Sequence, residues 1–238
     1  MNEYKAVFKA LKYVLFPKRC CFCGKVISPS EDECESCKNE VLRVEEPICY
    51  RCAVGKTRCN CQSKRNRYIT AFVAPFYYSG AVKNGIHRLK NGGEKDLSKS
   101  FADEMEKFIN RVYSGVKFDF VTFVPMTKKE LSDRGYNHVE LLASCLADNL
   151  GLPCKKVLSK LYETKRQREL KEKYRSGNVL GAFDVFERET IKNKRILLCD
   201  DVLTTGSTLT ECAKMLILNG AREVMCITIA VGMPKKRR

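Results

Sequence analysis

Two adjacent carboxylates, Asp200 and Asp201, follow a short apolar run and precede a turn rich in hydroxyl side chains. The apolar run, residues 196–199, has the character of a parallel strand that is buried on both faces. The turn offers backbone N–H groups, hydroxyls and a glycine that allows close backbone approach, which together suit a phosphate group. Its residues are Thr204, Thr205, Gly206, Ser207 and Thr208. We therefore predict a site for a phosphorylated sugar, the alternative being an acidic strand end before an ordinary helix.

A helix is expected to begin directly after this turn. Thr208 and Glu211 have the spacing of a capping box, and apolar residues at helical spacing follow them. Gly220 is expected to end the helix. Two neighbouring carboxylates repel each other unless hydroxyl donors or a divalent cation offset their charge, so the pair itself indicates a ligand.

The second group of residues with recognisable chemistry is cysteine. Nine of the fourteen cysteines lie between Cys20 and Cys61, a distribution that favours metal binding over an evenly spaced disulfide framework. Paired knuckles predict two closed tetrahedral Zn²⁺ sites with structural roles. The first set is Cys20, Cys23, Cys34 and Cys37, and the second is Cys49, Cys52, Cys59 and Cys61. Disulfides, a ligand role for Cys21 in place of Cys20, and pairs interleaved between the two ions remain as alternatives.

The chain of 238 residues is strongly basic, with a formal net charge of +16. Two filled four-cysteine zinc sites would leave about +12. Such a field attracts polyanions, with nucleic acid and phosphorylated substrates as candidates and a solvated lysine-rich surface as the alternative. No apolar run is long enough to span a membrane. Lysines interrupt the apolar residues of segment 4–15, and this pattern favours an amphipathic helix over a signal peptide. A cytoplasmic location is therefore expected.

The pattern divides the chain into an N-terminal helix with a double zinc ribbon, residues 1–66, and a second region, residues 67–238. Strands alternate with helices in the second region, which predicts an α/β fold with a parallel sheet flanked by helices. Ligands bind such sheets at the carboxyl ends of strands, where Pro125 and Asp200 both fall. The expected strands cover residues 70–78, 119–124, 182–186, 196–199 and 224–231, and the expected helices cover residues 80–90, 97–112, 137–150 and 208–217.

Two further segments carry polar residues that could serve the same site. Residues 125–136 are expected to form a polar loop, in which Arg134 supplies a cation and Gly135 permits a sharp turn into the next helix. Residues 164–183 contain few large apolar side chains, so we expect a segment that a ligand orders, the alternative being an ordinary charged helix.

The segment from residue 196 to Thr208 resembles the fingerprint of type I phosphoribosyltransferases, which bind 5-phosphoribosyl 1-pyrophosphate with Mg²⁺. The resemblance implies that Asp200 and Asp201 hold the ribose hydroxyls, and it makes them the candidate catalytic residues. It also implies that Thr204, Thr205, Gly206, Ser207 and Thr208 hold the 5-phosphate. Arg134 and Gly135 would lie in the pyrophosphate loop, and Gln167 and Arg175 in a flexible loop that closes over the ribose.

The whole constellation resembles the ComF family, in which a double zinc ribbon precedes a phosphoribosyltransferase-like domain. The matching features include the knuckles, the sequence from Arg134 to Asn137, Gln167, and the acid pair with its loop. The chain departs from this pattern at His138, where glutamine is expected, and at Lys165 and Arg166, where a threonine usually precedes Gln167. ComF proteins are associated with DNA uptake in naturally competent bacteria.

The resemblance implies a protein that binds phosphoribosyl pyrophosphate and single-stranded DNA and acts with a helicase-like competence partner in natural transformation. An alternative is an active phosphoribosyltransferase that transfers phosphoribose to an unidentified acceptor and releases pyrophosphate. A third hypothesis makes the ligand a regulator of DNA binding. No segment indicates a nucleobase pocket, so the acceptor is not identified.

Overall fold

The computed structural model describes residues 17–61, 66–161 and 181–234. Three sequence-based expectations lie wholly or partly outside these residues: the N-terminal helix, part of the junction between the two regions, and the loop with Gln167 and Arg175.

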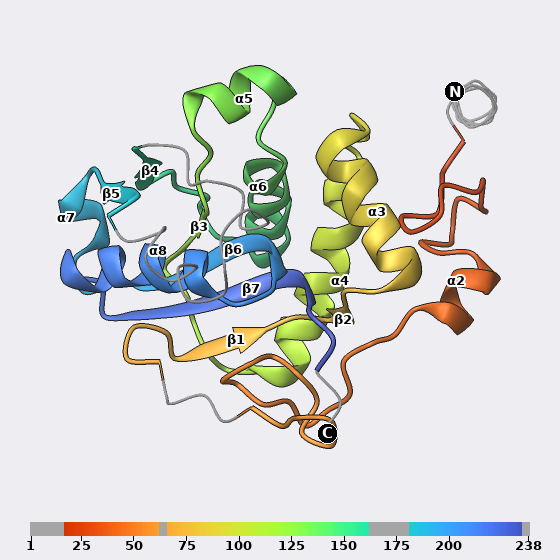
Figure 1. Cartoon of the computed structure of the whole chain (residues 1–238), viewed down its shortest axis with the longest axis horizontal. Coiled ribbons are helices and arrows are strands. Elements are labelled where there is room, and N and C mark those ends of the chain that lie inside the picture. The colour runs from red at the N-terminus through yellow and green to blue at the C-terminus, as the bar shows by residue number, and fades with distance from the viewer. Residues whose placement is uncertain (1–16, 62–65, 162–180, 235–238) are drawn as a thin grey trace, which may run out of the picture.

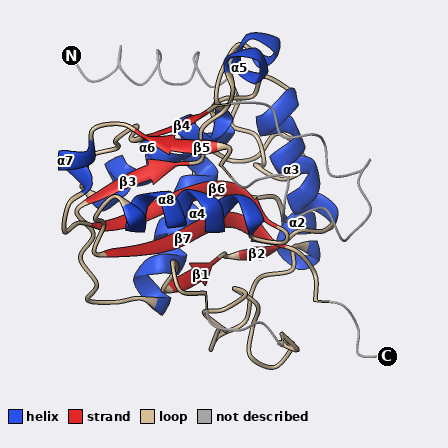
Figure 2. Ribbon diagram, turned by 60° about the vertical axis from the view of Figure 1, so that its left-hand side comes forward, coloured by secondary structure: helices blue, strands red, loops and turns tan. Residues whose placement is uncertain are grey.

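The centre of the molecule is a parallel five-stranded sheet of order β1-β7-β6-β3 (Figures 1 and 2). The strands are β1 (Ala71–Val73), β3 (Phe120–Phe123), β6 (Arg195–Leu203) and β7 (Glu223–Val231), and β2 (Phe76–Tyr77) continues the β1 edge along β7. The apolar residues of β1, β3 and β7 are buried on both faces, as expected of a parallel sheet covered by helices. The predicted strand at residues 70–78 is divided into β1 and β2 around Pro75.

Helices cover the sheet in the arrangement that right-handed crossovers require. The connection with α3 and α4 runs from β1 and β2 across to β3 at the opposite edge. The connection with α6 continues in the same direction, because Cys154 pairs in parallel with Val121 on the outer side of β3. The connection through α8 runs the opposite way, from β6 to β7, which places α8 on the other face (Figure 2). The bounds are α3 Gly80–Asn91, α4 Leu97–Val112, α6 His138–Leu150 and α8 Ser207–Leu218.

A small antiparallel sheet lies beside this layered core. It consists of β4 (Leu158–Lys160) and β5 (Phe183–Val185), and α8 packs against β5. The expected strand at residues 182–186 is therefore present, but it pairs outside the main sheet. The remaining short helices are α2 (Glu35–Glu40), α5 (Lys128–Arg134) and α7 (Arg188–Ile191).

Three local predictions near the expected site were wrong. The acid pair does not end its strand, because β6 continues to Leu203. Helix α8 begins at Ser207 with Gly206 as its N-cap, and Glu211 does not close a capping box on Thr208; its Oε1 accepts the backbone N–H of Gly181 at 3.1 Å.

The segment after Pro125 is not a plain polar loop. It contains α5, whose capping box is formed by Thr127 and Glu130. Gly135 ends this helix in the left-handed conformation with φ 73°, so the sharp turn expected there is present.

The cysteine-rich region shares the hydrophobic core of the sheet. Phe22 packs edge-on against Phe76 and Phe101, with ring centroids 5.3 and 6.0 Å apart. The backbone N–H of Tyr77 donates to Leu42, and that of Val44 donates to Pro75, so the chain before the second cysteine set covers the β2 edge of the sheet. The predicted fold class is confirmed: a parallel α/β sheet with flanking helices follows two cysteine clusters.

Candidate ligand site and cysteine clusters

The acid pair lies on β6, and Asp200 is in register with Thr228 of β7. Asp201 Oδ2 accepts from Lys90 Nζ of α3 and from His138 Nε2 of α6, each at 3.0 Å. The backbone N–H of Asp201 donates to Asp200 Oδ1 at 2.9 Å. The Asp201 side chain is 13% exposed and that of His138 only 2%. Two helices on one face of the sheet therefore hold a single carboxylate oxygen.

The surroundings shift the pKa values of the two acids in opposite directions. Burial and the neighbouring charge of Asp201 raise the pKa of Asp200 to about 7. Burial also opposes ionisation of Asp201, but the hydrogen bond from His138 and the charge of Lys90 outweigh it and hold the pKa of Asp201 well below its usual range. Asp201 is thus the carboxylate of the pair that stays charged at neutral pH.

A second lysine lies near the acids. Lys160 of β4 forms hydrogen bonds of 2.9 and 3.0 Å with the two carboxylate oxygens of Glu130, and its charge acts to lower the pKa of Asp200. Burial raises the pKa of Glu130, but the Thr127 backbone N–H and Lys160 lower it overall. This ion pair connects the small sheet to α5 beside the acid pair.

The loop after β6 presents hydroxyl side chains at the surface. Thr204 and Thr205 are exposed, and Thr205 Oγ1 lies 3.0 Å from Ser207 Oγ. The N-cap residue of α8, Gly206, has no side chain, and the Ser207 N–H donates to Thr205 Oγ1 at 3.4 Å. The partial positive charge of the helix N-terminus favours an anion there. Gly206 has φ 74°, and a Cβ at this position would lie 3.3 Å from Leu203 Cδ1, so both conformation and space favour glycine.

The structure brings Asp200, Asp201 and residues 204–208 together at the carboxyl end of β6. Arg134 and Gly135 lie at the end of α5, and among the described residues Arg134 makes no ion pair with either acid. The next residue, Tyr136, fixes this segment to α3, because its hydroxyl donates to the Leu89 carbonyl.

Sequence reasoning missed Lys90 and Lys160, and it noted His138 only as a departure from a family pattern. Lys90 contacts an acid 111 positions away, and no local spacing indicates that contact. The spacing of Thr127 and Glu130 is a capping-box signal that could have indicated α5 and, with it, the position of Glu130.

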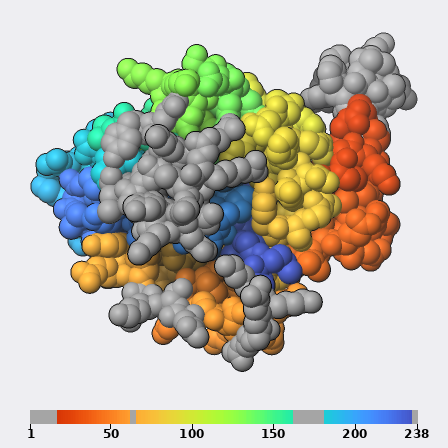
Figure 3. Space-filling view, viewed as in Figure 1, coloured from red at the N-terminus to blue at the C-terminus, as the bar shows by residue number. Residues whose placement is uncertain are grey.

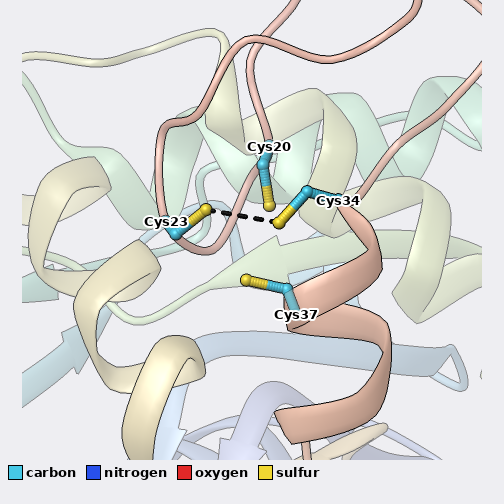
Figure 4. Close-up of side chains that lie close together, drawn as sticks. All are labelled: Cys20, Cys23, Cys34 and Cys37. Atoms are coloured by element: carbon cyan, nitrogen blue, oxygen red, sulfur yellow. Dashed lines mark hydrogen bonds between the residues drawn. The ribbon is translucent and has the colours of Figure 1, made fainter.

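The cysteines form the two predicted sets, and within each set the sulfur atoms lie within 4.8 Å of one another. In the first set (Figure 4), Cys23 Sγ and Cys34 Sγ are 3.5 Å apart. In the second set, Cys52 and Cys59 are separated by 3.6 Å and Cys49 and Cys61 by 3.7 Å. Sulfur ligands about 2.3 Å from a tetrahedral Zn²⁺ lie roughly 3.8 Å apart, whereas a disulfide bond measures about 2.05 Å. The clusters therefore fit zinc.

Hydrogen bonds favour the thiolate form at one cysteine of each set. Burial opposes ionisation of Cys20, but backbone N–H groups of Cys23 and Cys34 lower its pKa to about 7. Burial also opposes ionisation of Cys59, and the Cys61 N–H and neighbouring thiols lower its pKa to about 7. Cys21 lies outside both sets, and burial raises its pKa strongly, so Cys20 is the member of the first set, as preferred from the spacing.

Comparison with known proteins agrees with this organisation. Residues 11–65 match the Double zinc ribbon domain family, and residues 140–238 match the Phosphoribosyl transferase domain family. The chain is 25% identical over 204 residues to the competence protein ComFC of Bacillus subtilis, and this alignment covers 82% of each chain. The chain belongs to the ComF family.

Two other relatives align over smaller parts of this chain. Competence protein F of Haemophilus influenzae is 37% identical over 93 residues, covering 38% of this chain and 41% of the relative. The DNA utilization protein YhgH of Salmonella typhimurium is 29% identical over 143 residues, covering 58% and 62%. Within residues 17–61, 66–161 and 181–234, no helix has the length and apolar character needed to cross a bilayer.

Proposed function

We propose that this ComF protein binds 5-phosphoribosyl 1-pyrophosphate with Mg²⁺ at the carboxyl end of β6 and acts in the uptake or processing of DNA. The observation that carries the ligand assignment is the placement of an acid pair next to a hydroxyl-rich loop and a helix N-terminus whose N-cap residue is glycine. Residues 140–238, which match the phosphoribosyl transferase domain family, include all of these groups.

Each group has a role in this proposal. Asp200 and Asp201 accept hydrogen bonds from the ribose hydroxyls, and Thr204, Thr205, Gly206, Ser207 and Thr208 hold the 5-phosphate. Arg134 and Gly135 lie in the loop proposed to hold pyrophosphate, and Gln167 and Arg175 belong to the segment proposed to close over the ribose. The Mg²⁺ that accompanies the ligand neutralises part of the pyrophosphate charge.

The DNA role rests on charge and on the named relatives. Relatives of this chain carry the names competence protein and DNA utilization protein. Its net charge of +16, about +12 with zinc bound, favours binding of a polyanion such as single-stranded DNA. We also propose that the protein acts with a helicase-like competence partner and that it is located in the cytoplasm.

Calorimetric titration with phosphoribosyl pyrophosphate and Mg²⁺ tests the ligand assignment. The parent protein is expected to bind, and the double variant Asp200→Asn with Asp201→Asn is expected to show no measurable binding, because the ribose then loses its charged acceptor. Asp133→Asn, an exposed change on α5, is the matched control and should bind as the parent does. Equal binding by the parent and the double variant would contradict the assignment.

The same variants separate the ligand site from DNA binding. Affinity for single-stranded DNA should remain within a few-fold of the parent in the double variant and should fall steeply as salt increases. Equal loss of ligand and DNA binding would contradict separate sites.

Phosphoribosyl transfer is the second candidate function, and the acid pair is the observation that favours it. In that reaction the bond between the ribose C1 and pyrophosphate breaks and a bond from C1 to the acceptor forms. A carboxylate beside C1 stabilises the positive charge that develops there. Pyrophosphate released only when an acceptor is added, and lost in the double variant, would support transfer.

A further inference from the structure

Helix α3 reaches the acid pair from outside the region that matches the phosphoribosyl transferase domain family. Its penultimate residue, Lys90, places Nζ 3.0 Å from Asp201 Oδ2, the oxygen that His138 Nε2 also contacts. Lys90 and His138 both precede residue 140, where the family match begins. Neither residue is therefore part of the fingerprint that indicates the ligand.

The two contacts offset the electrostatic cost of placing a charged carboxylate beside a second carboxyl group. Asp201 is 13% exposed and directly follows another carboxyl group, and removing a charge from water in such a place is costly unless it is paired. Lys90 remains 35% exposed, so its ammonium group faces solvent as well as Asp201. His138 is buried, and its Nδ1 has no hydrogen-bond partner among the residues that the structure describes. The contact with Asp201 is therefore the hydrogen bond that fixes its ring.

We propose that Lys90 and His138 are positioning residues of the phosphoribosyl pyrophosphate site. They hold Oδ2 of Asp201 from one side and so fix the direction in which the carboxylate presents its other oxygen to the ribose hydroxyls. They also offset the repulsion within the acid pair before ligand arrives. This inference rests on the proposed function of the site.

The position of Lys90 depends in turn on the first cysteine cluster, because α3 packs against that cluster. A Cβ on Gly85 would lie 2.5 Å from the Cys21 carbonyl oxygen, so the backbone of the knuckle rests directly on the helix. Arg88 Nη1 donates to the Cys20 carbonyl at 3.3 Å. Figure 3 shows α3, in yellow, between the cysteine-rich segment in red and α5 in green. The first cysteine cluster thus supports the helix that places Lys90 beside Asp201.

Titration of four variants with phosphoribosyl pyrophosphate and Mg²⁺ tests the proposal. Lys90→Met removes the charge while keeping much of the side-chain volume, and we expect the ligand affinity to fall about tenfold or more, the loss of one charged contact. Lys83→Met makes the same change at an exposed position of α3 and should bind as the parent does. Lys90→Arg, which keeps the cation, should recover most of the affinity. His138→Gln keeps an N–H donor and should bind more tightly than Lys90→Met.

Thermal unfolding midpoints of the same proteins show whether each variant is folded. If the parent binds and Lys90→Met binds as tightly as Lys83→Met, the positioning role is wrong while the proposed function stands. Equal loss in Lys90→Met and Lys90→Arg would also overturn it, because the cation would then not be what matters. Absence of binding in the parent itself would overturn the proposed function and this inference together.

Discussion

At the scale of single residues, the site depends on which of the two acids carries the negative charge. Asp201 holds the charge because Lys90 and His138 contact it, and Asp200 is left beside it in a half-buried position that disfavours a second charge. A ribose with two neighbouring hydroxyls can donate to both carboxyl groups, and it therefore matches this pair better than a ligand with a single donor.

The raised pKa of Asp200 predicts a pH-dependent contribution to stability. An acid whose pKa is higher in the folded protein binds its proton more tightly there, so its contribution to stability is lost as the pH rises from about 4 to about 7. Asp200→Asn cannot titrate and should remove this loss. Thermal unfolding at pH 5 and pH 8 is therefore expected to show a smaller decrease for Asp200→Asn than for the parent. Asp133→Asn should behave like the parent, and an identical decrease in all three proteins would contradict the assignment.

At the scale of elements, the site is assembled from parts with different sequence signals. The apolar strands and the cysteine knuckles are local patterns, and the structure contains them. Two details differ from the prediction, because the strand of the acid pair continues to Leu203 and the strand at residues 182–186 pairs outside the main sheet. The prediction for the start of α8 was wrong because Glu211 accepts a hydrogen bond from Gly181, just before β5, a tertiary contact that its capping-box spacing cannot show. Lys90 was missed for a related reason, since its partner is brought near only by the packing of α3 beside β6.

Helix α3 provides the element-scale prediction. Gly85→Ala would bring a methyl group to 2.5 Å from the Cys21 carbonyl and 2.9 Å from the Phe101 ring, so the helix or the knuckle must shift. Overpacking of this kind costs about 1–3 kcal/mol. We expect a lower free energy of unfolding in urea and weaker binding of phosphoribosyl pyrophosphate. Asn84→Ala, an exposed change on the same helix, is the control. Unchanged stability in Gly85→Ala would show that the cluster and α3 are not tightly packed.

At the scale of the whole molecule, the cysteine-rich region is part of the structure that supports the sheet. The second cluster borders β1, where the Phe72 N–H donates to the Tyr50 carbonyl, and the first borders α3. Zinc binding and the integrity of the ligand site should therefore be connected.

Metal analysis tests that connection. Protein purified under reducing conditions without chelator should contain close to two zinc ions per chain, and Cys37→Ser should lose one of them. Because the first cluster supports α3, Cys37→Ser should also lower the unfolding temperature and the affinity for phosphoribosyl pyrophosphate. Cys145→Ser, outside both clusters, should retain two zinc ions. Zinc-free parent protein that is folded and binds ligand normally would contradict a structural role for the metal.

The most direct test of the central claim is a crystal structure with phosphoribosyl pyrophosphate and Mg²⁺ bound. The ribose hydroxyls should lie within hydrogen-bond distance of Asp200 and Asp201, and the 5-phosphate should lie against residues 204–208. Ligand bound elsewhere would contradict the account, for example in the cavity of about 340 Å³ lined by Arg67, Tyr68 and Arg222 at the amino ends of the strands.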